Sequence, residues 1–213
     1  MQIVVAKNPE KINHLVAELK NKKYFVILLS ILLLGMLCGA LAVKMLGDSY
    51  GNYINKYFEN FFNLRASSGF TNLFFNLFLT SIASLILIGV SSFGISGLLS
   101  LPSFIFLKGI GSCIISGLLY RNFSLEGIAF DDLILLPFSI ASNFIFLYLS
   151  SYGIELSLRF LNAIKCVSVT GIELRPKCIL FLKKMLWCVL FVGVVSLLES
   201  IFTVCFINYF SFL

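Results

Sequence analysis

Residues Tyr24 to Met45 read YFVILLSILLLGMLCGALAVKM and carry no charged side chain before Lys44. A helix needs roughly 20 apolar residues to cross a hydrocarbon layer about 30 Å thick, and this stretch is long enough. The apolar region of a signal peptide is shorter, about 7–15 residues. A lipoprotein signal would need a small residue before Cys38, where Leu37 stands. We therefore expect an uncleaved membrane-spanning helix here.

The composition of the whole chain is that of a membrane protein. Of its 213 residues, 59% are hydrophobic and only 12% are charged, and the mean hydropathy is +1.00. A soluble domain is about 25% charged, so this chain has too few polar side chains to cover a surface in water. The composition disfavours a soluble enzyme, a nucleic-acid-binding domain and a disordered tail. The expected surroundings are a lipid bilayer, with no nucleic acid partner.

Four further apolar stretches are long enough to be membrane spans, at approximately residues 70–89, 98–120, 128–150 and 185–207. The stretch at residues 98–120, the third span of the chain, is rich in glycine and contains Pro102. Because proline removes a backbone hydrogen bond, we expect this helix to be broken near Pro102. The predicted fold is an all-α polytopic membrane bundle of about five transmembrane helices. A six-span chain, split at Pro102, is the alternative.

The basic residues lie mainly in two blocks, which indicate the orientation. One block is in an amphipathic arm, residues 1–23, and the other is in a charged segment, residues 151–184. Cytoplasmic segments are enriched in Lys and Arg, so we expect both blocks inside a bacterial plasma membrane, with the N-terminus cytoplasmic. Transmembrane helices 1–4 then occupy residues 24–150. Helix 5 and an external C-terminus occupy residues 185–213.

Ionisable residues interrupt the apolar spans at two places. Lys108 lies mid-way along the third span and Glu199 mid-way along the fifth. Charged side chains are costly at this depth and are usually paired or functional. We predict either a Lys108–Glu199 ion pair that holds the helices in register, or a polar route or partner-binding notch inside the membrane. Asp131 and Asp132 are expected at the membrane interface.

Small residues recur at a spacing of four in two of the spans. Gly35 and Gly39 form a GxxxG pattern in the first span, and Gly109, Cys113 and Gly117 continue the pattern in the third. Such faces allow helix backbones to approach closely in lipid. We predict helix-packing faces at these positions, used either within the chain or in assembly with another membrane protein.

Motifs for catalysis and for cofactors are incomplete or absent in the sequence. Residues 94–97 read GISG, the local pattern of an intramembrane serine protease, but that chemistry needs a general base. The one histidine, His14, lies on the N-terminal arm. The chain has no HExxH zinc motif, no Walker A motif and no CxxC pair. We expect a protein that is not an enzyme and that binds no cofactor or metal.

The first and third spans resemble the stage II sporulation protein M family. The likeness lies in LLLGMLCGA, Leu32 to Ala40, and in SSFGISGLLSLPSFIFLKGIGSCIISGLLY, Ser91 to Tyr120, with its Lys108-Gly109 pair. The resemblance implies a non-catalytic membrane scaffold that recruits or localises partners during sporulation and engulfment. Those partners would be other membrane proteins, including peptidoglycan hydrolases.

A second functional hypothesis comes from the charged residues. The chain is alternatively the membrane subunit of a transporter similar to ATP-driven exporters. Its polar route would then pass near Lys108 and Glu199, and the segment 151–184 would meet an ATPase.

Overall fold

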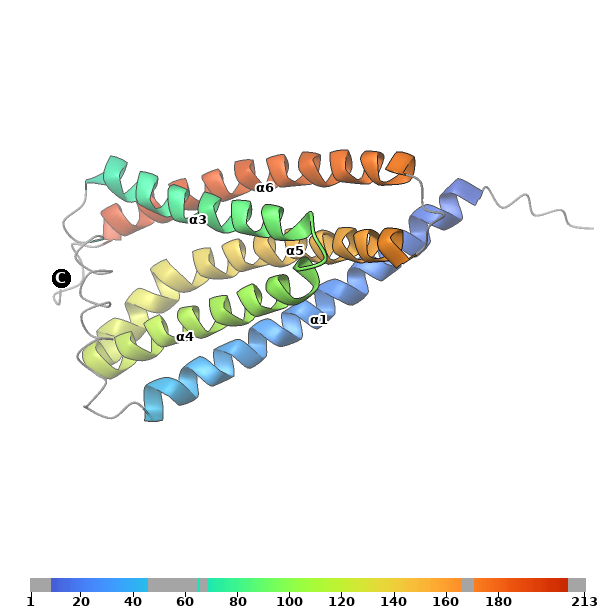
Figure 1. Ribbon diagram of the computed structural model, residues 1–213. Helices are drawn as coiled ribbons and strands as arrows, with labels where there is room; N and C mark the ends of the chain where they lie inside the picture. The colour runs from blue at the N-terminus through green and yellow to red at the C-terminus, as the bar shows by residue number, and fades with distance from the viewer. Residues whose placement is uncertain (1–8, 46–64, 66–68, 166–170, 207–213) are drawn as a thin grey trace, which may run out of the picture.

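The computed structural model describes residues 9–45, 65, 69–165 and 171–206, and every long element in these ranges is a helix (Figure 1). The elements are α1 (Pro9–Met45), α3 (Phe70–Ser92), α4 (Gly97–Phe130), the π-helical turn η1 (Asp131–Leu135), α5 (Leu136–Lys165) and α6 (Gly171–Phe206). Five stretches within the described residues are long and apolar enough to cross a membrane. The predicted all-α bundle is therefore confirmed, and the chain is a multi-pass membrane protein.

Helix α4 passes through Pro102 without interruption, so the predicted break at this residue was wrong. Pro102 lies in the second turn of α4, which begins at Gly97. Proline at that position removes only one hydrogen bond, the bond to the carbonyl group of Leu98 four residues earlier. The six-span alternative depended on a break at this point, and within the described ranges the number of spans is five.

Three helices extend beyond the predicted spans at the end of the bundle that carries the basic blocks. Helix α1 continues through residue 23 without a break, so the described part of the arm and the first span are one helix. Residues 151–165 are the last turns of α5, and residues 171–184 are the first turns of α6. At 1.5 Å per residue α5 and α6 are about 45 and 54 Å long, which exceeds the hydrocarbon thickness of about 30 Å. Residues 1–8 and 166–170 lie outside the described residues.

The chain reverses direction between the third and fourth spans. A Cβ on Gly127 would overlap the carbonyl group of Leu119, eight residues earlier. In a straight helix these residues would be about 12 Å apart, so the chain must fold back between them. The hydroxyl of Tyr120 donates a hydrogen bond of 2.8 Å to Asp131 across this corner.

A tight turn joins α3 to α4, and the GISG sequence forms part of it. The side chain of Ser96 is exposed. Gly97 is buried, and a Cβ at this position would lie 2.5 Å from the carbonyl oxygen of Ser91. The final glycine of GISG therefore allows a close approach between backbones.

The small residues of α1 and α4 face one another, and this contact joins the two helices. A Cβ on Gly109 would lie 2.5 Å from the carbonyl oxygen of Leu32. A Cβ on Gly39 would lie 2.7 Å from the carbonyl oxygen of Ile110 and 3.1 Å from Cβ of Cys113. Gly35 and Gly117 lie in the same contact, against Phe106 and Val43. The structure thus uses these five small residues for packing within the chain.

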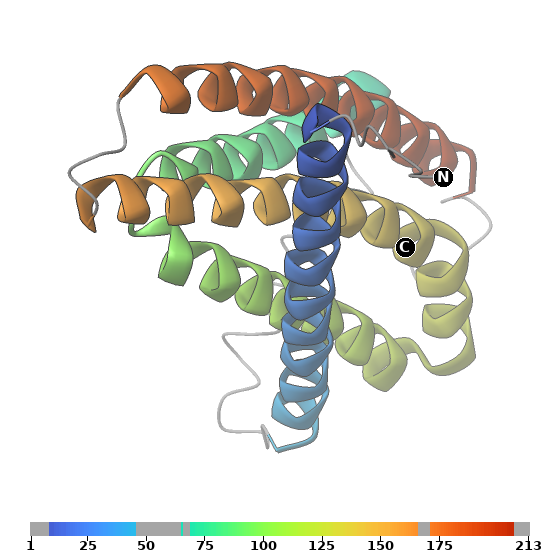
Figure 2. The ribbon, with the colours of Figure 1, turned by 90° about the vertical axis from the view of Figure 1, so that its right-hand side faces the viewer.

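Helix α1 lies obliquely across α4 and α5, while α3 and α6 pack together farther from it (Figure 2). Buried side chains from these helices form the main apolar core, which includes Leu28, Leu85, Leu101, Phe146 and Val192. Because α1 and α6 sit on either side of α5, one face of α5 is left between them.

Substitution of Gly109 by alanine tests the α1–α4 contact. The added methyl group would overlap the Leu32 carbonyl group, and overpacking of this kind costs about 1–3 kcal/mol. We expect Gly109→Ala to lower the free energy of unfolding by that amount in denaturant titrations in mixed micelles. Gly111→Ala, on the same helix, is the matched control because a Cβ there meets nothing within 4 Å. Equal stability of the two variants would contradict the proposed contact.

Candidate functional site: a polar cavity inside the bundle

A cavity of about 430 Å³ lies between α3, α4, α5 and α6, and Arg65 also borders it. Most of the residues that line it are polar, although the helices around it are apolar. The polar lining residues are Arg65, Asn76, Thr80, Ser81, Lys108, Ser112, Ser116, Asp131, Ser139, Ser142, Asn143 and Glu199. Except for Arg65, these residues come from helices long and apolar enough to span the membrane. The spans therefore surround a cavity with polar side chains on its wall, and Asn76 and Thr80 lie at its exposed edge.

Glu199 forms an ion pair with Arg65 rather than with Lys108. The Nη2 atom of Arg65 donates a hydrogen bond of 2.5 Å to Oε1 of Glu199. The side chains of Arg65 and Glu199 are only 7% and 14% exposed. A buried charge requires a partner, and the guanidinium group is well suited to a buried carboxylate. The pair connects α6 to the segment that precedes α3.

Lys108 lines the same cavity as Glu199, as the polar-route alternative requires, but it makes no direct ion pair with it. Its ammonium group lies 5.0 Å from the centre of the Phe146 ring, a cation–π contact. Among the described residues, no carboxylate lies within 4.0 Å of this ammonium group. Lys108 thus presents a cation to the cavity, and no carboxylate of the described ranges is in direct contact with it.

Asn143 contributes an amide group that has no hydrogen-bond partner in the described part of the chain. The residue is 4% exposed, and both its Nδ2 and its Oδ1 atoms are buried and unpaired. A buried polar group without a partner costs about 1–3 kcal/mol. Because Asn143 borders the cavity, water or a solute in the cavity would supply the missing bonds.

Asp131 is buried in the structure, whereas the sequence suggested an interfacial position. It is 1% exposed and accepts the hydrogen bond from Tyr120, while Asp132 is exposed. Asp131 begins η1, and the wider π-helical turn changes the direction in which side chains leave the helix. Neighbouring residues therefore have very different surroundings, with Asp131 on the cavity and Asp132 on the outside.

Several hydroxyl groups around the cavity bond to carbonyl groups of their own helices. Ser112 donates to the carbonyl group of Lys108, Thr80 to that of Asn76, and Ser142 to that of Ser139. These bonds satisfy the hydroxyl protons in an apolar setting and leave oxygen lone pairs free to accept. The hydroxyl groups can thus receive hydrogen bonds from water or from a solute.

The formal charges around the cavity balance. Arg65 and Lys108 are cationic, and Asp131 and Glu199 are anionic. Within the described residues, no three His, Cys, Asp or Glu side chains converge as a metal cluster would require. The arrangement is suited to a small polar molecule held by hydrogen bonds and paired charges.

The chain matches no family model, no curated protein and no solved structure. Its function is therefore inferred from the geometry of the cavity.

Two important cavity residues were not singled out in the sequence. Arg65 stands between the first two apolar stretches in the sequence, and it lies 134 residues from its partner Glu199. Asn143 stands in the apolar run SIASNFIF, where an amide is unusual, and this would have been a usable signal. The i, i+4 spacing of Asn76 and Thr80 is a second signal, because it places two polar groups on one face of α3.

A double-mutant cycle on Arg65 and Glu199 tests the buried ion pair. Removing one partner leaves a buried charge uncompensated, so Arg65→Met and Glu199→Gln should each lower the free energy of unfolding by about 3–5 kcal/mol. The loss of unfolding free energy in the double variant should be clearly smaller than the sum of the losses in the two single variants. Unfolding in mixed micelles provides the measurement.

The matched control is the same cycle on Lys108→Met and Glu199→Gln. These side chains share the cavity without direct contact, so their coupling energy should be the smaller of the two. A coupling between Lys108 and Glu199 that equals or exceeds the coupling between Arg65 and Glu199 would contradict the pairing.

Proposed function

We propose that this protein is the membrane-embedded component of a transport system for small polar solutes. The observation that carries the proposal is the polar cavity between the spans. On its wall are the Lys108 cation and the Asn143 amide, which have no ion-pair or hydrogen-bond partner among the residues that the structure describes. Ionisable and polar groups at bilayer depth are costly, and they are characteristic of solute pathways. A bundle that needed only to pack could have filled this space with apolar side chains.

The charges of the cavity favour a zwitterionic solute. The ammonium group of Lys108 and the amide of Asn143 would bind a carboxylate. The carboxylate of Asp131, which keeps its bond to Tyr120, has further lone pairs for an ammonium group. A solute that carries both charges would leave the cavity neutral, which avoids the cost of a net charge in a low dielectric.

The size of the cavity limits the solute to a small molecule. Binding pockets for small ligands have volumes of about 300–1,000 Å³, and the cavity, at about 430 Å³, is near the lower end. It therefore has room for an amino acid or a methylated ammonium acid, together with some water. A folded protein or a long peptide would not fit.

The scaffold role implied by the family resemblance stays a prediction. It requires partner proteins and contact surfaces on the outside of the bundle, and it does not explain polar groups that face an interior cavity. The bacterial plasma membrane and the cytoplasmic N-terminus are likewise proposals. Their support is the position of both basic blocks at one end of the bundle (Figure 1).

Ligand-dependent thermal stability tests the proposed function directly. The full chain in lipid nanodiscs would be heated with glycine, L-serine, glycine betaine, acetate or glucose at millimolar concentrations. We expect the zwitterions to raise the unfolding midpoint, with a stabilisation of about 1.4 kcal/mol at ten times Kd. Proteoliposomes should then show uptake of the same zwitterion in radiolabelled form.

The control variants separate binding in the cavity from general effects of solutes. Lys108→Met should lose most of the stabilisation because it removes the cation that would bind the carboxylate. Lys44→Met removes a lysine outside this cavity and should keep the full effect. The proposal fails if no zwitterion stabilises the protein, or if Lys108→Met responds as the unmodified chain does.

A further inference from the structure

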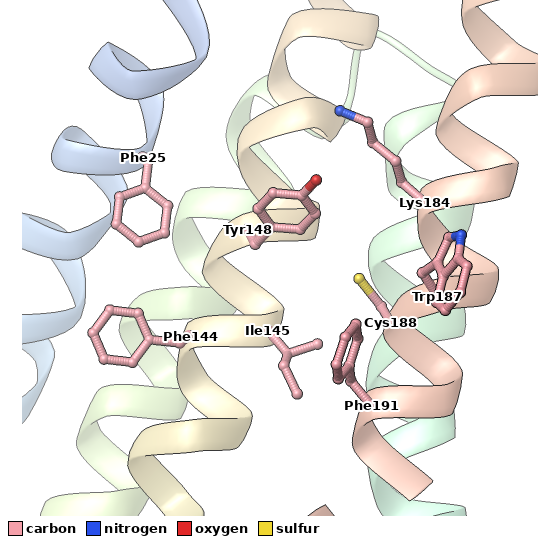
Figure 3. Close-up of a pocket in the computed structure, with 8 residues that line it drawn as sticks. All are labelled: Phe25, Phe144, Ile145, Tyr148, Lys184, Trp187, Cys188 and Phe191. Atoms are coloured by element: carbon pink, nitrogen blue, oxygen red, sulfur yellow. The ribbon is translucent and has the colours of Figure 1, made fainter. Parts of the chain in front are cut away.

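A second pocket of about 550 Å³ lies on the outside of the bundle, in a groove between α1 and α6 (Figure 3). Residues from α5 form its floor, and residues from α1 and α6 form its two sides. The groove is lined by Phe25, Phe144, Ile145, Tyr148, Lys184, Trp187, Cys188 and Phe191. None of these residues borders the polar cavity, so the groove is a separate feature.

The residues from α6 occupy one face of the helix in a definite order. Lys184, Trp187, Cys188 and Phe191 stand at positions i, i+3, i+4 and i+7, which lie above one another on a helix. Figure 3 shows the ammonium group of Lys184 at one end of the groove, with Phe191 farther along it. The groove therefore passes from a cationic end through amphipathic rings to a purely apolar end.

The cationic end has no carboxylate partner among the described residues. The ammonium group of Lys184 lies over the rings of Tyr152 and Tyr148, at 3.0 and 5.6 Å from the ring centres. Lys22 is exposed on α1 and stands one turn before Phe25, on the same face. Both lysines belong to the end of the bundle that carries the basic blocks, so the helices on both sides of the groove bring positive charge to this end.

The apolar end is open to its surroundings. Trp187, Phe191 and Phe144 are 62%, 58% and 50% exposed. In a membrane-spanning bundle such rings face hydrocarbon, and Trp and Tyr favour the level of the lipid headgroups. The order of chemistry along the groove matches that of a phospholipid, with a charged headgroup followed by an apolar chain.

We propose that this groove binds an anionic phospholipid. Its phosphate lies beside Lys184, and one acyl chain lies along the floor of α5 between Phe144 and Phe191. The charge of the lysines selects an anionic headgroup over a zwitterionic one, as at basic sites between transmembrane helices. This site does not depend on the transport function proposed for the cavity.

Trp187 makes the site directly measurable because it is the one tryptophan of the chain and lines the groove. The full chain would be reconstituted in phosphatidylcholine vesicles that contain brominated phosphatidylglycerol or, at the same mole fraction, brominated phosphatidylcholine. Bromine quenches tryptophan fluorescence on contact. We expect brominated phosphatidylglycerol to quench Trp187 several-fold more effectively.

Neighbouring lysines on α6 provide a matched pair of variants. Lys184→Ala should reduce the relative association constant of phosphatidylglycerol about five-fold, the effect of one lysine near a headgroup. Lys183→Ala removes the same charge one residue away, on an exposed side chain outside the groove, and should keep the preference. Lys184→Arg keeps the charge and should also keep the preference.

Three results would overturn the proposal. Equal quenching by the two brominated lipids would show that the groove does not select the headgroup. If Lys183→Ala and Lys184→Ala reduced the preference for phosphatidylglycerol equally, the lipid would be attracted only by the general charge of the surface. Absence of quenching by either lipid would show that a protein helix, from a second copy or another protein, covers Trp187.

Discussion

The cost of placing ionisable side chains in a low-dielectric bilayer determines how the interior of this bundle is built. Glu199 is compensated by Arg65, Asp131 is bonded to Tyr120, and the ammonium group of Lys108 lies over an aromatic ring. Each contact joins segments that are distant in the sequence or lie on either side of a chain reversal. Polar groups stabilise one another only when they are in contact, and these groups accordingly lie around one cavity.

The two halves of the bundle have different kinds of contact. Helix α1 packs on α4 through small residues such as Gly39 and Gly109, where the backbones approach closely and leave little space. Around the cavity, α3, α4 and α5 carry serine, threonine and asparagine side chains, and α6 contributes Glu199. The close α1–α4 contact holds α4 in place, and the looser packing around the cavity leaves room for a solute. Helix α1 lines none of the cavity but forms one side of the outer groove.

The sequence predicted the spans well because twenty consecutive apolar residues have few other uses, and it identified Lys108 and Glu199 because charge is rare at such depth. It could not identify Arg65 as the partner of Glu199, since no periodicity relates residues 134 positions apart. The prediction of a break at Pro102 overestimated the disruptive effect of a proline near the start of a helix, where it removes only one hydrogen bond. The burial of Asp131 depends on the chain reversal and on a π-helical turn, which hydropathy does not reveal.

Transport through the spans requires that water reaches the polar cavity, and this can be measured by the accessibility of cysteines on its wall. In a chain without its six native cysteines, Ser112→Cys and Ser142→Cys would place thiols on the cavity wall. Leu107→Cys and Leu133→Cys, at outward-facing positions that are 64% and 62% exposed, are the controls. We expect a charged, membrane-impermeant thiol reagent to modify the cavity thiols about ten-fold faster than the control thiols, or more, because only thiolates in contact with water react readily. Equal or slower modification of the cavity thiols would contradict it.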